Sequence, residues 1–263
     1  MIEQLLAPFR NRRLLLELAR NDFRARYTGS LLGAFWSFVQ PLLTIVLYLF
    51  IFQVGFRTTP PSHVPFVLWL VVGIAPWFYF TEALTTATGS LLEYSYLVKK
   101  VRFEVSIVPT IKLVSSAFTH SVVWIIVMVI VGVSGYPPAL TWLQVPYFFV
   151  ALFLLTSVLA RLTSALTPFV RDTSQIVAVA LQFTFWLTPV MWTLEQAPHG
   201  IARVLAWNPL YYVVDGLRQA LLEHGWFWSH PVQTVYFWGV VLVLALAGEL
   251  LFKRLRPHLA DVL

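Results

Sequence analysis

Cysteine is absent from the 263-residue chain, and charged side chains make up only 11% of it. The lack of cysteine excludes disulfides, thiolate metal sites and a cysteine nucleophile. A soluble domain carries about 25% charged residues, so this chain has too few of them to cover a surface that faces water. With 59% hydrophobic residues and a mean hydropathy of +0.75, the composition is that of an integral membrane protein.

Signatures of ATP and metal binding are also missing. A phosphate-binding loop needs a glycine directly before its lysine, and none of the lysines follows a glycine. The sequence has no His-Glu-x-x-His pair and no Gly-x-Ser-x-Gly elbow. We therefore expect no metal site, no catalytic residue and no cofactor on this chain. If ATP drives the protein, a separate subunit binds ATP and magnesium.

Six apolar runs have about the length of 20 residues that a helix needs to cross a bilayer core. With proline and glycine as breaks, they lie at 33–56, 65–88, 106–134, 143–168, 174–194 and 232–252. The sequence therefore predicts an all-α polytopic membrane protein with a single domain at 1–263. Residues 33–194 hold the first five spans, and residues 253–263 form a tail.

The distribution of basic residues predicts the orientation. Fifteen of the 18 lysines and arginines fall on the side of the two termini, whereas Arg57, Arg203 and Arg218 fall on the other side. The positive-inside rule therefore places both termini in the cytoplasm. Because topology explains the excess of positive charge, we expect no binding to nucleic acid.

Residues 1–30 have the pattern of an amphipathic helix. An apolar set and a charged set recur at roughly helical spacing on different faces: Leu5, Phe9, Leu16, Phe23 and Tyr27 against Arg13, Glu17, Arg20 and Arg24. This pattern favours a helix that lies in the membrane interface with its apolar face toward the lipid. An ordinary soluble amphipathic helix is the alternative.

The outer segment 195–231 is too long for a turn and too broken for a span. Proline removes a backbone donor and disfavours helix in the residue before it, so Asn208-Pro209 breaks the helix. We expect two short re-entrant helices here, before the last span. Irregular backbone at membrane depth is tolerated only where protein buries it or where it lines a wet cavity.

Few charged residues lie inside the predicted spans. Glu82 and Lys112, on consecutive antiparallel spans, are expected to form an ion pair; separate snorkelling of each to water is the alternative. His120 lies in the middle of the third span. A hydrogen-bonded, neutral packing histidine is favoured over a proton relay, although an intramembrane ionisable group suggests the latter by default.

Two further segments carry chemistry. "SLLEYSYLVKKVRFE", 90–104, mixes apolar and basic residues and suits a short helix that rests on the membrane and meets a soluble partner; a solvated loop is the alternative. "LQFTFWLTPVMW", 181–192, places aromatic faces beside amide and hydroxyl groups, as a sugar chain prefers. Packing alone would also explain these aromatic residues.

Three ordered blocks together resemble a known family. "ELARNDFRARYTGSLLGAFWSFVQPL" contains Arg-Tyr-x-x-Ser-x-Leu-Gly-x-x-Trp before a proline, and "VRDTSQIVAVALQFTFWLTPVMW" and "NPLYYVVDGLRQALLEHG" follow in order. This pattern resembles the permease subunits of type-2 ABC exporters of polysaccharides. "YLVKKVRFE" is similar to the coupling segment of that family, with Glu104 where a proline is usual.

The resemblance implies a homodimer bound by two copies of a cytoplasmic ATPase in the bacterial inner membrane, exporting a polyprenyl diphosphate-linked glycan such as O antigen, teichoic acid or capsule. O antigen is our first choice. The first and fifth spans of each copy would line the pore. The residues expected to serve these roles are Glu93, Tyr94, Tyr96, Leu97, Lys99, Lys100 and Arg102 for coupling to the ATPase; Arg20, Arg24 and Arg26 for the lipid diphosphate; Trp36, Gln182, Phe183 and Trp186 for the glycan pathway; and Asn208, Pro209, Tyr211, Tyr212 and Arg218 for the outer gate.

Other function classes remain open. The three arginines could instead bind anionic lipid headgroups. A drug or lipid exporter of the ABC type is the nearest rival. A membrane-embedded glycosyltransferase or phosphotransferase would need clustered carboxylates, and a secondary carrier would need acidic residues at the midplane; neither pattern stands out.

Overall fold

The computed structural model describes residues 10–28, 33–56, 64–96 and 104–262, and these residues form helices and connecting turns without a strand. Five segments are long and apolar enough to cross a membrane, namely Phe38–Gly55, Phe66–Thr88, Val105–Val133, Leu140–Leu166 and Pro231–His258. The all-α membrane architecture predicted from the sequence is thus confirmed. The α-helices are α2 Arg12–Tyr27, α3 Gly33–Leu49, α4 Phe66–Thr88, α5 Ser90–Glu93, α7 Val108–Val133, α8 Val145–Leu166, α9 Thr173–Leu187, α10 His199–Leu205, α11 Pro209–Arg218, α12 Pro231–Leu255 and α13 Leu259–Val262.

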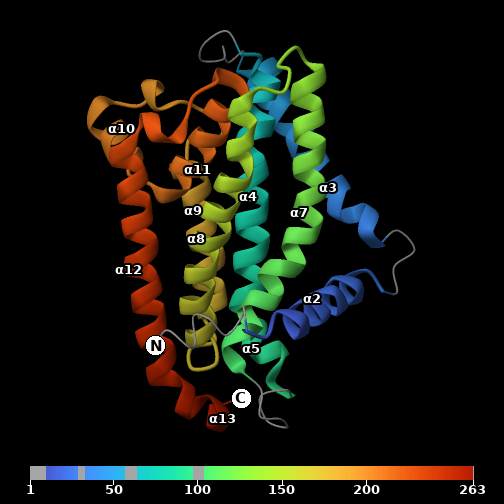
Figure 1. Cartoon of the computed structure of the whole chain (residues 1–263), viewed down its shortest axis with the longest axis vertical. Helices are drawn as coiled ribbons and strands as arrows, with labels where there is room; N and C mark the ends of the chain where they lie inside the picture. The colour runs from blue at the N-terminus through green and yellow to red at the C-terminus, as the bar shows by residue number, and fades with distance from the viewer. Residues whose placement is uncertain (1–9, 29–32, 57–63, 97–103, 263) are drawn as a thin grey trace.

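Helix α4 is the centre of the bundle. Most of its residues are buried, since α7, α8, α9 and α11 pack around it (Figure 1). Its apolar residues occupy all sides, as expected of a helix that is surrounded by other helices. The end of α12 with α13 lies at one end of the molecule together with α2 and α5, while α10 and α11 lie at the other end.

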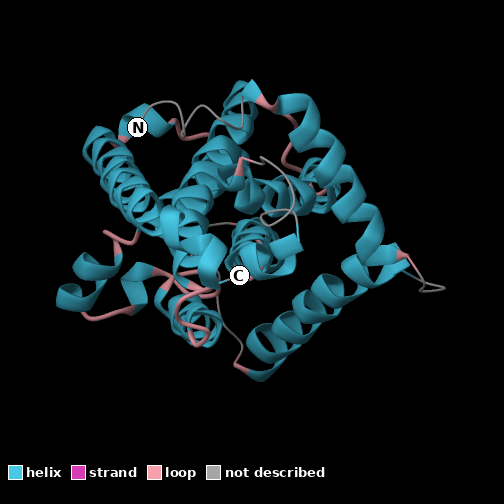
Figure 2. Ribbon diagram, turned by 90° about the horizontal axis from the view of Figure 1, so that it is seen from below, coloured by secondary structure: helices cyan, strands magenta, loops and turns pink. Residues whose placement is uncertain are grey.

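Helices α2 and α3 stand at one side of this bundle. Helix α2 packs against α7 and helix α3 packs against α4. Figure 2 shows the molecule end-on, with helices around all sides of the bundle. Helix α3 continues through a wider turn, Phe50–Gly55, and none of its candidate span is buried. The outward surface of this first span is therefore left for lipid or for another protein.

The buried face of α2 differs from the predicted one. Leu15, Ala19 and Asp22 are its buried residues, whereas Leu16 is 43% exposed. Phe23 and Tyr27 do turn inward, and the Phe23 ring meets Phe118 of α7 at 6.0 Å. Because α2 packs against α7, its orientation is fixed by protein contacts as well as by the membrane interface. Leu5 and Phe9 lie outside the described residues.

The predicted fifth span, 174–194, is shorter in the structure. Helix α9 has 15 residues, which at about 1.5 Å per residue falls short of a bilayer core of about 30 Å. It ends at Leu187 because Pro189 disfavours helix at Thr188. Helices α10 and α11 then follow on either side of Asn208, where the sequence predicts two short helices; their depth in a membrane stays a prediction.

The irregular turn after α9 is held by buried polar contacts. The guanidinium of Arg218, which is 1% exposed, donates to the carbonyls of Trp69, Pro189 and Val190 and stacks over the Trp69 ring at 3.8 Å. Gly73 makes room for it, because a methyl group there would overlap the guanidinium. The bonds of Arg218 to Pro189 and Val190 supply a donor to two carbonyls of the turn, where the chain has left α9.

Candidate functional site

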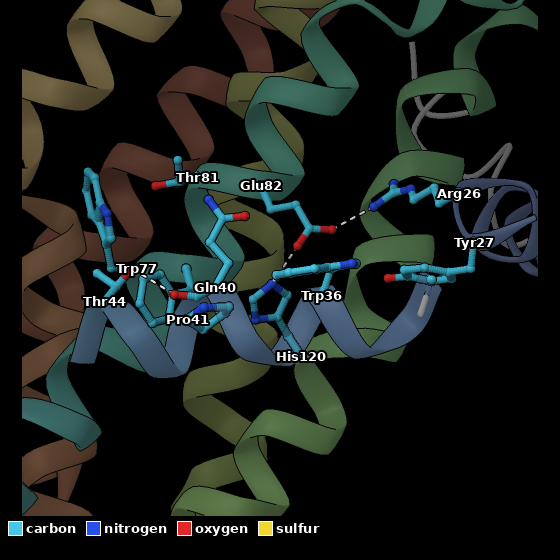
Figure 3. Close-up of a pocket in the computed structure, with 12 residues that line it drawn as sticks. Arg26, Tyr27, Trp36, Gln40, Pro41, Thr44, Trp77, Thr81, Glu82 and His120 are labelled. Carbon is cyan, nitrogen blue, oxygen red and sulfur yellow. Dashed lines mark hydrogen bonds and ion pairs between the residues drawn. The ribbon is translucent and has the colours of Figure 1, made fainter. Parts of the chain in front are cut away.

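A cavity of about 660 Å³ opens between the α2–α3 arm and the α4–α7 side of the bundle. Helix α3 contributes Trp36 and Gln40, α4 contributes Trp77, and α7 contributes His120 (Figure 3). This volume lies within the range of about 300–1,000 Å³ that is usual for small-ligand sites. The cavity is therefore large enough for part of a substrate.

Glu82 of α4 is the polar centre of the cavity wall. Its Oε1 accepts from the guanidinium of Arg26 at 2.6 Å and from the Ser116 hydroxyl at 2.9 Å. Its Oε2 lies 3.0 Å from Nε2 of His120. Figure 3 shows the carboxylate between Arg26 and His120, with Trp36 beside them. A carboxylate in this position has a fixed direction and a compensated charge.

A second group of charges lies directly behind this wall. Asp22 on α2 accepts from the Lys112 ammonium at 2.5 Å, from the Tyr94 hydroxyl at 3.0 Å and from Arg26 at 3.1 Å. Lys112 also donates to Glu93 at 2.7 Å. The side chains of Asp22 and Lys112 are 4% and 5% exposed. This network joins α2, α5 and α7 to the cavity wall.

Electrostatics keep Asp22 charged. Burial alone would raise the pKa of Asp22, but the hydrogen bond from Lys112 and the charges of Lys112 and Arg26 outweigh it, so the pKa lies below its usual value. Burial and the adjacent Asp22 charge raise the pKa of the Tyr94 phenol. Tyr94 therefore stays a hydrogen-bond donor to Asp22.

The predicted ion pair between Glu82 and Lys112 is not formed. Glu82 pairs with Arg26 and His120, whereas Lys112 pairs with Asp22 and Glu93. The reason is that α2 inserts Asp22 and Arg26 between these positions of α4 and α7, and each takes one partner. His120 is hydrogen-bonded and buried, as predicted for a packing histidine, although it also lines the cavity.

Of the residues predicted for coupling to an ATPase, the structure describes three. Glu93 and Tyr94 join the network through Lys112 and Asp22, while Tyr96 is exposed and stacks on Tyr94 at 6.3 Å. Leu97, Lys99, Lys100 and Arg102 lie outside the described residues. The contact of this segment with α2 was not anticipated from the sequence.

The three arginines predicted to meet a lipid diphosphate separate into two kinds. Arg20 and Arg24 are exposed on α2. Arg26 is instead turned into the protein, because Asp22 and Glu82 both pair with it. Arg26 therefore does not share the exposed face with Arg20 and Arg24, and its role toward a lipid diphosphate stays a prediction. The spacing of Leu15, Ala19, Asp22 and Arg26 along one stripe of a helix was the signal that could have shown this.

Residues predicted for the glycan pathway lie on two helices. Trp36 is 56% exposed and lines the cavity from α3. Gln182, Phe183 and Trp186 are exposed on α9 and do not reach this cavity. The two helices meet further along, where the Tyr48 ring stacks on Phe185 at 5.9 Å. A shared pathway along these faces stays a prediction.

The residues predicted for the outer gate form packing contacts in the structure. Oδ1 of Asn208 accepts from the Leu210 amide at 3.0 Å and so caps α11 directly before Pro209; its Nδ2 donates to Thr188 at the end of α9. The Tyr212 hydroxyl lies 2.8 Å from that of Tyr147. Tyr211 bonds Asp215 at 3.1 Å. Their gating role stays a prediction.

Two further observations concern ligands and ion pairs. Within the described ranges, no group of three or more His, Asp or Glu residues is placed to hold a metal ion. Arg161 of α8 pairs with Glu249 of α12 at 3.4 Å, and neither residue lines the cavity. This pair serves the packing of α8 on α12, where Glu249 is buried.

Comparison with known proteins supports a transport function. The family model described as ABC-2 type transporter matches residues 13–222. The chain is similar to an O-antigen export system permease protein RfbA of Myxococcus xanthus, with 29% identity over 99% of both chains. It is also similar to an RfbA protein of Klebsiella pneumoniae, with 26% identity over 95% of both, and to the polysialic acid transport protein KpsM of Escherichia coli, with 23% identity over 88% of this chain and 89% of the other.

Proposed function

Because the chain belongs to the ABC-2 type transporter family, we propose that it is the permease of an exporter that moves a lipid-linked O antigen across the bacterial cytoplasmic membrane. The observation that carries the proposal is the similarity to O-antigen export permeases along nearly the whole length of both chains. The chain is a permease and not an enzyme. A partner ATPase binds ATP and magnesium and supplies the energy.

The working assembly is a homodimer with two ATPase subunits. Helices α3 and α9 present exposed apolar surfaces, including Leu43 and Leu47 on the first and Phe183 and Trp186 on the second. In the dimer these two helices of each copy line the pore. The glycan slides along Trp36, Gln182 and the α9 aromatic residues, because many weak stacking contacts suit a moving polymer better than one tight site.

The ATPase acts on the end of the molecule that carries α2, α5 and α13. With both termini in the cytoplasm, the segment after α5 lies on the cytoplasmic side and meets the ATPase there. A displacement of Glu93 and Tyr94 is passed to Lys112 and Asp22, because these groups are bonded to one another. Arg26 extends the same network to Glu82 in the cavity wall.

The lipid diphosphate meets the exposed arginines of α2. Guanidinium groups bind phosphate oxygens with paired, charge-assisted hydrogen bonds. Arg20 and Arg24 are free to do this on the exposed face, whereas Arg26 serves to hold α2 against Glu82. The basic face also attracts anionic headgroups, so the two contributions require a matched control.

The test compares two double variants in a strain whose own copy of the gene is deleted. Arg20→Gln with Arg24→Gln should reduce O-antigen export roughly thirtyfold, at about 1 kcal/mol per charge and about 1.4 kcal/mol per factor of ten. Arg12→Gln with Arg13→Gln removes the same charge from exposed positions of the same helix. Surface glycan is measured on gels alongside the amount of permease in the membrane. Equal export by both variants would disprove the diphosphate assignment.

The function as a whole is tested by reconstitution. The chain and its ATPase in proteoliposomes should move a lipid-linked glycan only when ATP is hydrolysed. A capsule polymer is the second candidate cargo, because KpsM proteins that transport polysialic acid are also among the relatives. Identifying the lipid-linked glycan that co-purifies with the complex distinguishes the two. Transport by the chain alone, without an ATPase, would overturn the proposal.

A further inference from the structure

We propose that the cavity between the α2–α3 arm and the α4–α7 side binds an uncharged sugar ring of the exported lipid. This inference rests on the proposed function and adds to it a specific subsite for the sugar next to the diphosphate. The residues that form it are Trp36 and Gln40 of α3, Trp77, Thr81 and Glu82 of α4, and His120 of α7.

Two buried polar atoms in this wall have no hydrogen-bond partner within the described part of the chain. They are Nδ1 of His120, whose side chain is 2% exposed, and Oγ1 of Thr81. Leaving such an atom unpaired costs about 1–3 kcal/mol. Both residues line the same cavity, from neighbouring helices. A ligand with hydroxyl groups would supply the missing partners.

The polarity of the wall suits hydroxyl groups in particular. Nε2 of His120 faces Glu82, so Nδ1 is the ring atom left for a ligand; it accepts from a hydroxyl when the ring is neutral and donates to one when the ring is protonated. The Thr81 hydroxyl and the exposed Gln40 amide both donate and accept. A sugar hydroxyl also does both. Each of these groups can therefore be matched by one hydroxyl of a ring, without an ionised partner.

Two indole rings provide the apolar part of the site. Trp36 is more than half exposed and lies beside Glu82 and His120, and Trp77 lies near Thr81 (Figure 3). A sugar ring has an apolar face of CH groups and a polar rim, so it packs on an aromatic plane and hydrogen-bonds at its edge. The cavity offers both surfaces together.

A phosphate group fits this cavity poorly. The guanidinium of Arg26 is already paired with Asp22 and Glu82, and the Glu82 carboxylate would repel an anion. The exposed Arg24 precedes Tyr27, another lining residue, by three positions, which is about 4.5 Å along the helix. A diphosphate at Arg24 would thus place its first sugar at the cavity.

The experiment uses the full chain in lipid nanodiscs and two synthetic lipids. One is a short polyprenyl diphosphate that carries a single hexose, and the other is the same diphosphate without the sugar. The native chain should bind the hexosyl lipid more tightly. Thr81→Val removes only the unpartnered hydroxyl. It should lower the affinity for the hexosyl lipid about two- to tenfold and leave the affinity for the bare diphosphate unchanged.

Matched variants control for structural effects. Thr86→Val lies on the same helix, where the Thr86 hydroxyl bonds only carbonyls of its own helix, so it should change neither affinity. Trp36→Leu should lower the affinity for the hexosyl lipid but not for the bare diphosphate. Phe35→Leu, at the equally exposed neighbouring position, should lower neither affinity. Thermal unfolding of each variant checks that the fold is retained.

The outcomes separate this inference from the proposed function. Equal binding of the two lipids by the native chain, or equal effects of Thr81→Val and Thr86→Val, would overturn the sugar subsite and leave the export function standing. If neither lipid binds and the reconstituted complex moves no glycan, the proposed function fails and the subsite fails with it.

Discussion

Lys112 is the residue whose removal tests the buried network most directly. Its ammonium donates to Asp22 at 2.5 Å and to Glu93 at 2.7 Å. Lys112→Met keeps the length of the side chain and removes the charge. Because the side chain of Asp22 is 4% exposed, its carboxylate would lose its main partner in a buried place. Glu93 is 59% exposed in its side chain, so water compensates that loss.

The size of the effect follows from this burial. Breaking a buried pair by removing one partner costs about 3–5 kcal/mol. At about 1.4 kcal/mol per factor of ten, the equilibrium constant for docking of α2 on the bundle should fall roughly a hundredfold to several thousandfold. Native-state hydrogen exchange measures this directly, as faster exchange of the α2 amides at unchanged exchange in α4. Lys253→Met, at an exposed position of α12, serves as the control.

The double variant Asp22→Asn with Lys112→Met separates pairing from packing. It leaves no buried charge without a partner, because Arg26 keeps Glu82 and the exposed Glu93 faces water, so it should protect α2 better than Lys112→Met alone. The pH dependence has a definite sign. In the native chain the pKa of Asp22 lies below the ordinary carboxyl value of 3.8, so its stabilisation is present above that value and is lost as the pH falls through the lower folded pKa. In Lys112→Met, burial raises the pKa of Asp22, so acid should partly restore docking. Unchanged exchange in Lys112→Met would refute this account.

Two further predictions concern the outer end of the molecule. Gly73→Ala should lower the free energy of unfolding by about 1–3 kcal/mol, because the new methyl group collides with the Arg218 guanidinium. Gly239→Ala, whose methyl group would meet no atom within 4 Å, should not lower it. Equal melting temperatures of the two variants in detergent would contradict this prediction. Asn208→Ala should lower the free energy of unfolding by about 1–2 kcal/mol in the same assay, since it removes both the α11 cap and the bond to Thr188. Asn208→Asp keeps the cap and should lower it by less. An equal loss in both variants would argue against the cap.

The sequence predicted well those features that depend on one segment at a time. The apolar runs predicted five long spans to within a few residues, because crossing a membrane requires a certain length of apolar helix whatever its neighbours are. The break at Asn208-Pro209 was also visible, since proline acts on its own backbone. The same reasoning applied to Thr188-Pro189 would have found the early end of α9.

Only the tertiary structure decided which charges meet. Asp22 and Lys112 are 90 residues apart, and Arg26 and Glu82 are 56 apart, so no local spacing joins them. The sequence placed Arg26 with Arg20 and Arg24 because all three are basic residues of one helix. Its side chain instead points into the bundle, where Asp22 lies one turn away on the same helix and the packing of α2 on the bundle brings Glu82 of α4 within reach. Composition and periodicity determined that this chain is an integral membrane protein. The pairing of buried charges depends instead on contacts between helices that are far apart along the chain, and a single sequence does not specify these contacts.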